Sequence, residues 1–285
     1  MSATEIAQDQ ASKILGSIAI PPRPVALTQL MEENHKDSPD LRKIGKIIGD
    51  DVGLSAAVLK TVNSPFFGLR QKISSVPQAV SVLGQRNIGN IVTGLSLRNT
   101  LGGNAASLES FWDGAGRIAT VASYISARVP DVAKEEAHLF GLFRDCGIPL
   151  LMQRFPDYQD TLRLASSAAD KIFTAAEEER HATSHATVGF LLARSWCLPE
   201  PVCEGILHHH DYSILDESAN PAIHPKARAL IAITRLAEYV ASVAQRSDDD
   251  SEWLRVSNRV LDYLALSQDE VADLTEDICE KLQEN

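Results

Sequence analysis

Several side chains that could bind a metal ion lie in the second half of the chain. The run from His208 to Asp211 reads His-His-His-Asp, His185 precedes it, and Asp145 lies further upstream. Imidazole and carboxylate groups are the ligands that zinc and related divalent metals take in proteins. The residue beside Asp145 is Arg144, whose guanidinium has no lone pair for a cation. The pattern therefore predicts the frame of a metal hydrolase site in which an arginine stands where a ligating histidine would complete the set.

The elements that must position these groups read as helices joined by short breaks. Apolar stripes follow one another along the chain, whereas strand-like alternation and a repeat of roughly 20–50 residues are missing. Aromatic residues make up only 6% of the chain, and small and aliphatic residues dominate the apolar set. This composition suits packing of helix against helix. We therefore expect an all-α fold, a multi-helix bundle in two packed helical halves.

Two helix starts carry capping signals in the first part of the chain. Ser38 followed by Pro39 predicts an N-cap and a first helical residue. Ser75 with Gln78 three residues later predicts a capping box, with Pro77 in the first turn.

The run from Asn63 to Gly68, which reads NSPFFG, has two interpretations. In the first it is a buried turn, where Asn63 and Ser64 satisfy carbonyls at a helix end, Pro65 stops the helix and the two phenylalanines fill a seam. In the second the same residues form a knob that binds a partner.

Breaks in the helical pattern predict the domain limits. Residues 1–14 form an N-terminal segment, and the glycine pair after Leu101 separates a helical half at 15–101 from a second half at 106–245. The acidic run 247–250 reads as a solvated loop. Residues 251–285 then read as a C-terminal extension of two amphipathic helices, which either pack back on the body or support a homo-oligomer.

The bulk composition excludes several classes of partner. The chain has 285 residues, with 27 basic and 38 acidic side chains and a net charge of −11. Nucleic acids and anionic membrane surfaces would be repelled on average, so we expect neither as a partner. A signalling protein or a small ligand remains as the expected partner.

The cysteines and the start of the chain indicate a cytoplasmic protein. None of the four cysteines is spaced as in a CxxC motif, which predicts reduced thiols. The first residues lack a basic segment followed by an apolar run, so we expect no signal peptide. No apolar stretch reaches the roughly 20 residues that span a bilayer.

Seven blocks of the chain match the conserved blocks of one bacterial signalling family. They are residues 20–24 (IPPRP), 54–68 (LSAAVLKTVNSPFFG), 75–84 (SVPQAVSVLG), 140–147 (FGLFRDCG), 185–189 (HATVG), 196–199 (WCLP) and 206–210 (ILHHH). Together they resemble the HDOD domain, the HD-related output domain, over roughly residues 15–240. The resemblance implies an all-helical fold related to HD-type phosphohydrolases. Such modules are often fused to receiver or cyclase domains; neither is present here, so we expect a stand-alone module.

The resemblance also implies where metal ligands of the wider HD superfamily would fall. The early histidine corresponds to a position near Gly114, and the His-Asp pair corresponds to Arg144 and Asp145. The final aspartate corresponds roughly to Glu238. The later histidines correspond to His185, His209 and His210. At least two ligands are thus missing, which argues against hydrolysis.

Each of these side chains has two interpretations. Asp145, His185, His209 and His210 either hold a divalent metal or are relics satisfied by hydrogen bonds to the backbone and to one another. We expect His208 to be exposed.

Arg144 either turns outward to solvent or supplies the charge of a lost metal. In the second case it would be held by Asp145, by Glu238 or by a bound anion. The acidic run 177–180 reads as a solvated helix face.

The resemblance and the degenerate pair together predict a regulatory module of HDOD type without catalysis, which binds a protein partner or a small ligand. The expected cofactor is none, with a divalent metal as the alternative. The rival function is a metal-dependent phosphohydrolase acting on a phosphomonoester or a cyclic dinucleotide. A third interpretation is a helical scaffold in which residues 251–283 drive oligomerisation.

Overall fold

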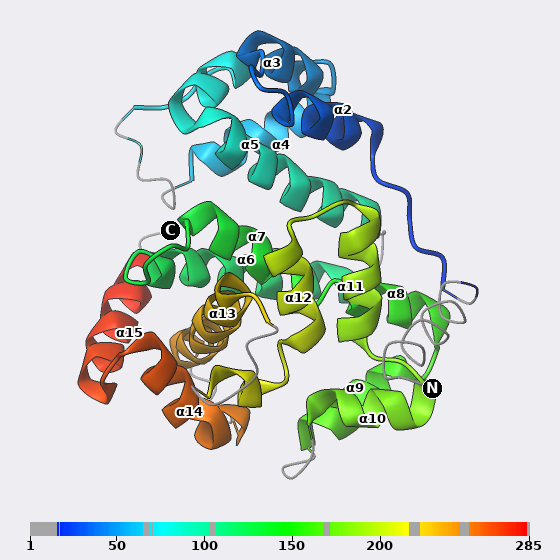
Figure 1. Ribbon diagram of the computed structural model, residues 1–285, viewed down its shortest axis with the longest axis vertical. Coiled ribbons are helices and arrows are strands. Elements are labelled where there is room, and N and C mark those ends of the chain that lie inside the picture. Colours follow the sequence, from blue (N-terminus) through cyan, green and yellow to red (C-terminus); the bar gives the residue numbers. More distant parts are fainter. Residues whose placement is uncertain are drawn as a thin grey trace. The chain divides into compact units, whose positions relative to one another are not determined.

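The structure is a computed structural model in which every described regular element is a helix (Figure 1). It describes residues 16, 18–64, 69, 71–102, 106–167, 172–216, 223–245 and 251–283. The all-α prediction is therefore confirmed. Among these residues, no helix combines the length and the apolar character that crossing a bilayer requires.

The chain divides into two compact units. Residues Arg23–Ala106 form one unit, and residues Met1–Pro22 and Ser107–Glu284 form the other. Some of the predicted segments lie outside the described residues. They are the N-terminal segment 1–14, residues 65–68 of the turn, the second glycine of the pair (Gly103) and the loop 247–250.

The four helices described in the smaller unit enclose an aliphatic core. They are α2 (Val25–Asn34), α3 (Leu41–Gly49), α4 (Val52–Val62) and α5 (Val76–Leu101). The other three helices all pack against α5. The buried side chains that fill the space between them include Leu27, Leu30, Ile44, Ile48, Val58, Val62 and Ile88.

Helices α3, α4 and α5 start at side-chain caps, whereas α2 starts after Pro24 without one. Ser75 is the N-cap of α5 and accepts a hydrogen bond from the backbone of Gln78, as predicted. The side chain of Gln78 reaches back to the backbone N–H of Ser74 at 3.0 Å. The predicted cap at Ser38 is wrong: α3 begins two residues later, because the carboxylate of Asp40 accepts from two first-turn N–H groups.

Asn63 closes the end of α4. Its amide donates to the carbonyl of Leu59 at 2.8 Å, which is the satisfied helix end expected from the sequence. The same amide also exchanges two hydrogen bonds with the backbone of Ile73, at 2.8 and 2.7 Å. Asn63 thus connects the end of α4 to Ile73, on the far side of the segment 64–72. Residues 65–68 lie outside the described residues, so both interpretations of them, turn and knob, stay predictions.

The larger unit holds every residue of the predicted site. Its described helices are α6 (Ala106–Ser126), α7 (Lys134–Phe143), α8 (Gly147–Arg154), α9 (Tyr158–Ser167), α10 (Phe173–His181), α11 (His185–Ser195), α12 (Glu200–His208), α13 (Pro225–Ala244), α14 (Ser251–Leu264) and α15 (Gln268–Gln283). A short 3-10 helix, η2 (Tyr212–Leu215), follows α12. Helix α11 packs against α8 and α12, and α13 packs against α7, α12, α14 and α15 (Figure 1).

A glycine at the start of α8 allows two segments of the site to approach each other. A Cβ on Gly147 would lie 2.1 Å from the backbone oxygen of His185, far inside van der Waals contact. Since backbone cannot move aside as a flexible side chain can, this position requires glycine. The close approach brings the turn after α7 next to the first residue of α11.

We predict that Gly147→Ala destabilises the protein by about 1–3 kcal/mol or more, because the new methyl group must push two backbone segments apart. Thermal unfolding followed by circular dichroism measures the change. Gly114→Ala is the matched control, since a Cβ there meets no atom within 4 Å inside helix α6. A stability for Gly147→Ala equal to that of the control would contradict the packing described here.

A second prediction concerns Glu33, a buried carboxylate of the smaller unit. It accepts hydrogen bonds from Lys36 at 2.7 Å and from the backbone of Asp40 at 3.1 Å, and pairs with Lys43 at 2.8 Å. The hydrogen bonds from the two lysines and from the backbone N–H of Asp40 lower the pKa of Glu33 to about 2. A carboxyl whose folded pKa is depressed adds stability above its unfolded pKa, and this stability is lost as the pH falls toward the folded value.

Wild type should therefore be more stable than Glu33→Gln at pH 7, and this difference should shrink as the pH falls from about 4.5 to about 2. Urea denaturation at several pH values measures the difference. Glu32→Gln, which changes an exposed neighbour, is the control. A difference that does not depend on pH would show that the two lysines do not stabilise the ionised form.

Candidate metal centre

Four side chains converge on one point in the larger unit. One donor atom from each of Asp145, His185, His209 and His210 lies within 4.8 Å of all the others. The Nε2 atom of His185 is 3.1 Å from that of His209 and 3.2 Å from that of His210. The Oδ1 atom of Asp145 is 3.4 Å from His185 Nε2 and 3.3 Å from His209 Nε2.

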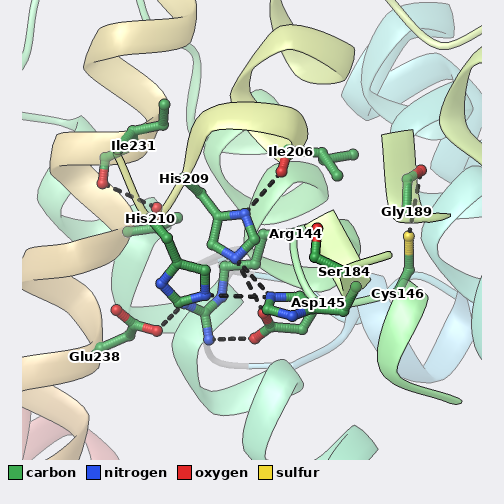
Figure 2. A network of polar contacts seen from close by, with 12 residues as sticks. Arg144, Asp145, Cys146, Ser184, Gly189, Ile206, His209, His210, Ile231 and Glu238 are labelled. Atoms are coloured by element: carbon green, nitrogen blue, oxygen red, sulfur yellow. Dashed lines mark hydrogen bonds and ion pairs between the residues drawn. The ribbon is translucent and has the colours of Figure 1, made fainter. Parts of the chain in front are cut away.

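Three helix ends bring these groups together. Asp145 lies in the turn between α7 and α8, and His185 is the first residue of α11. His209 and His210 directly follow α12, and Figure 2 shows their rings pointing towards Asp145. Ser184 fixes the start of α11 by accepting a hydrogen bond from the backbone of Thr187 at 3.3 Å. The four donors thus come from segments that are separate in sequence and meet only in the fold.

The ring of His185 is oriented by a buried carboxylate. Its Nδ1 atom lies 2.7 Å from Glu177 Oε2, and both side chains are fully buried. Glu177 also accepts a hydrogen bond from the Tyr158 hydroxyl. The prediction that residues 177–180 form a solvated face is therefore wrong for Glu177, which points inward from α10. The other three residues of this run, 178–180, are exposed.

The ring of His209 is oriented in the same manner by the backbone. Its Nδ1 atom lies 2.7 Å from the carbonyl oxygen of Ile206, which can only accept (Figure 2). A neutral imidazole that donates through Nδ1 has a lone pair on Nε2. His185 and His209 would then direct two lone pairs at each other across 3.1 Å. Such a contact requires a proton or a cation between the rings.

The charges around the cluster match this requirement. Burial lowers the pKa of His185, but Glu177 and Asp145 outweigh burial and raise it to about 9. Burial lowers the pKa of His209. Burial would raise the pKa of Asp145, but Arg144 and the imidazoles of His185 and His209 hold it well below its usual range. A positive charge is therefore favoured at the centre of the cluster, either as a proton on His185 or as a metal ion.

The donor set fits a divalent transition metal. Corners of a tetrahedron centred about 2.0–2.1 Å from its nitrogen ligands are about 3.3–3.4 Å apart. Four of the donor pairs lie at 3.1–3.4 Å, and all the donors lie within 4.8 Å of one another. Imidazole-rich sets with one carboxylate suit zinc and its neighbours in the first transition row. Metal-binding histidines are commonly oriented by an acceptor at the ring nitrogen that does not bind the metal. Glu177 is such an acceptor at Nδ1 of His185, and the carbonyl of Ile206 is one at Nδ1 of His209.

Arg144 lies beside the cluster and is not turned to solvent, since it is only 6% exposed. Its Nη2 atom is 2.7 Å from Asp145 Oδ2, and its Nη1 atom donates to Glu238. Glu238 is also 2.5 Å from Arg235. Figure 2 shows the guanidinium between Asp145 and Glu238. The two carboxylates named in the sequence hypothesis are thus both bound to Arg144.

The remaining sequence candidates lie outside the cluster. Glu238, which corresponds to the final aspartate, pairs with two arginines and is not among the four donors. Gly114, near the position of the early histidine, has no side chain to donate. His208, expected to be exposed, is half-buried in the last turn of α12.

Sequence reasoning missed three residues at the site. Glu177 was hidden in an acidic run, although it lies eight positions before His185 and faces inward. Phe173 stacks on His210, with ring centroids 4.8 Å apart and planes at 8°. Glu252 lies 3.5 Å from His210 Nδ1, and its position far along the chain carried no signal in the sequence.

The comparisons with known proteins agree with the fold and with the sequence blocks. The HDOD domain model matches residues 20–212, and the chain belongs to the HDOD family. A curated relative, an uncharacterized protein of Treponema pallidum (strain Nichols), is 26% identical over 234 residues. That match covers 79% of this chain and 45% of the relative, so the chain spans about half of the relative's length.

Solved structures of similar fold include the following three. An HDOD domain protein of unknown function from Geobacter sulfurreducens has a TM-score of 0.72 at 20% identity, over 99% of this chain and 96% of that chain. A provisionally named phosphohydrolase from Shewanella amazonensis SB2B has a TM-score of 0.69 at 19% identity, over 96% and 93%. A provisionally named signal transduction protein from Marinobacter aquaeolei VT8 has a TM-score of 0.69 at 18% identity, over 98% and 64%. At these identities the likeness establishes the all-helical fold.

We predict that Arg144→Met lowers the stability of the protein by about 1–3 kcal/mol, because it leaves Asp145 and Glu238 without their shared partner. Urea denaturation measures the loss. Glu238→Leu should lower the stability as well, because it removes a carboxylate that pairs with both Arg144 and Arg235.

Arg194→Met is the control for this series. Arg194 forms an exposed ion pair with Glu200 at 2.6 Å, so its loss should cost less than about 1 kcal/mol. Equal losses for Arg144→Met and Arg194→Met would contradict a structural role for the buried guanidinium.

Proposed function

We propose that this chain is a regulatory HDOD module without catalysis, which acts by binding a protein partner or a small ligand. The observation that carries the proposal is the commitment of both Asp145 oxygens. Oδ1 faces the imidazoles of His185 and His209, and Oδ2 is bound to Arg144 at 2.7 Å. The signal transduction designation of the Marinobacter neighbour is consistent with this role.

The commitment of Asp145 limits the number of cations that the site can hold. In two-metal hydrolases a pair of ions clamps the attacking and the leaving oxygen. A carboxylate that bridges two ions offers one oxygen to each, and the second oxygen of Asp145 is bound to a guanidinium. Arg144 supplies positive charge there, but a guanidinium cannot take the place of a metal ion that binds and activates a water molecule. We therefore expect room for one metal ion at most.

In this proposal the residual site holds a single divalent metal through Asp145, His185, His209 and His210. Four protein donors complete a tetrahedral shell, as in structural zinc sites, whereas catalytic zinc sites keep one position for water. A metal bound there would supply Lewis acidity and a rigid link between its ligands. The residues themselves connect the turn after α7, the start of α11 and the end of α12.

Such a link would let the site act as a regulatory switch. A ligand shifts a conformational equilibrium only by its difference in affinity for the two states. Because the four donors sit on three helix ends, any rearrangement of these helices changes their spacing and hence the affinity for the bound group. A protein or a small ligand would bind one of the two helix arrangements in preference to the other.

One observation favours a second candidate function, a metal-dependent phosphohydrolase. Three imidazoles and a carboxylate are a donor set found in hydrolytic metal sites, and the Shewanella neighbour is provisionally named a phosphohydrolase. This activity would require the single metal to polarise a phosphoester and acidify water without help from a second ion.

Phosphoester hydrolysis separates the two functions, measured as phosphate release from a monoester and as conversion of a cyclic dinucleotide to linear products by chromatography. The full chain is incubated with zinc, manganese or ferrous iron and with p-nitrophenyl phosphate or a cyclic dinucleotide, beside His209→Ala. We predict no turnover above that of His209→Ala, because Arg144 occupies the place of a second cation. Metal-dependent turnover that is lost in His209→Ala would contradict the regulatory proposal and support the phosphohydrolase.

A further inference from the structure

Helix α14 reaches the metal centre from outside the part of the chain that matches the family model. The match ends at residue 212, and α14 spans Ser251–Leu264. Its second residue, Glu252, places Oε1 3.5 Å from Nδ1 of His210. This nitrogen is buried and makes no hydrogen bond to another residue that the structure describes. The gap is about 0.3 Å beyond the usual upper limit of about 3.2 Å for such a bond.

The carboxylate of Glu252 stands where a metal-binding histidine needs an acceptor. His185 has Glu177 at its Nδ1 atom, and His209 has the carbonyl of Ile206. His210 directs its Nε2 atom at His185, and Glu252 is the group that faces its other nitrogen. An acceptor at this nitrogen fixes the tautomer that leaves a lone pair on Nε2.

A second contact connects α14 to the arginine that binds Asp145. The Trp253 ring stacks on Tyr239, with centroids 4.5 Å apart and planes at 12°. The guanidinium of Arg235 lies over the same indole at 5.7 Å. Arg235 pairs with Glu238, which in turn binds Arg144. Two successive residues of α14 are therefore linked to the centre, Glu252 through His210 and Trp253 indirectly through Arg235 and Glu238.

The rest of α14 packs on the same unit. Val256, Val260 and Leu261 are buried, and Arg259 pairs with Asp216 at 3.0 Å. In Figure 1, α14 lies beside α13, in agreement with their contacts. Docking of this helix therefore places Glu252 and Trp253 together.

We infer that α14 is the element that reports occupancy of the four-donor site: Glu252 positions the His210 ring, and a bound metal in turn stabilises the docked helix. The inference rests on the proposed function, since it names the regulation of that same site. The coupling must work in both directions, because a group that raises metal affinity when docked is itself held more tightly by the metal.

Metal titration of Glu252 variants tests the positioning role. Co²⁺ binding is followed by absorption in the visible range, and Zn²⁺ binding by calorimetry, both on the full chain. Glu252→Ala should weaken binding about 10–100-fold, as expected for loss of a group that orients a ligand. Glu252→Gln should recover part of the loss, because its carbonyl oxygen can still accept from His210. Asp262→Ala, which removes an exposed carboxylate of the same helix, should bind like wild type.

Hydrogen exchange of the wild-type chain tests the coupling without any variant. Zn²⁺ should slow exchange of the amides in residues 251–264, because the helix is held more tightly when the site is filled. This measurement decides the matter even where Glu252→Ala fails to fold by circular dichroism.

The outcomes separate this inference from the proposed function. Zinc binding in wild type with unchanged exchange of α14, or with Glu252→Ala within twofold of Asp262→Ala, overturns the inference and leaves the metal site standing. An absence of zinc binding in wild type overturns both the inference and the metal part of the proposed function.

Discussion

The carboxylate of Asp145 is the group on which the site depends, because it is shared between two kinds of cation. One oxygen faces the imidazoles of His185 and His209, and the other is bound to the guanidinium of Arg144. A partly buried carboxylate needs compensating charge, and here the protein supplies part of it permanently through an arginine. Only the imidazole side is left for an exchangeable proton or metal ion.

The rest of the larger unit positions this carboxylate and its partners at helix ends. The turn after α7 can approach the start of α11 because Gly147 has no side chain to collide with His185. The start of α11 is fixed by its Ser184 cap and by Glu177 from α10, whose carboxylate also accepts from Tyr158. Since the donors belong to different segments, the distances between them depend on how α8, α11 and α12 pack.

The sequence was sufficient for the helical fold and for the residues that meet at the centre. The family blocks and the apolar stripes indicated an all-α chain, and the four metal-ligand candidates do lie together. Local signals were less dependable, since Ser75 caps its helix but Ser38 does not, because the nearby Asp40 competes as the stronger acceptor.

The groups that orient the donors could not be predicted. Glu177 looks like its exposed neighbours in sequence, and only the rotation of α10 about its axis turns this one carboxylate inward. Glu252 follows His210 by more than forty residues, and their contact depends on how α14 packs on α13. Such long-range contacts are set by tertiary packing, which single-residue patterns do not encode.

The number of metal ions bound per chain tests the central claim most directly. The full chain, purified without chelator and then incubated with zinc or manganese, is freed of loose metal and measured by plasma mass spectrometry beside His209→Ala. Since Arg144 takes one side of Asp145, we predict about one equivalent in wild type and far less in His209→Ala. Two equivalents would show that the guanidinium does not fill the second cation position, and less than about a tenth of an equivalent would show that the histidines hold only a proton.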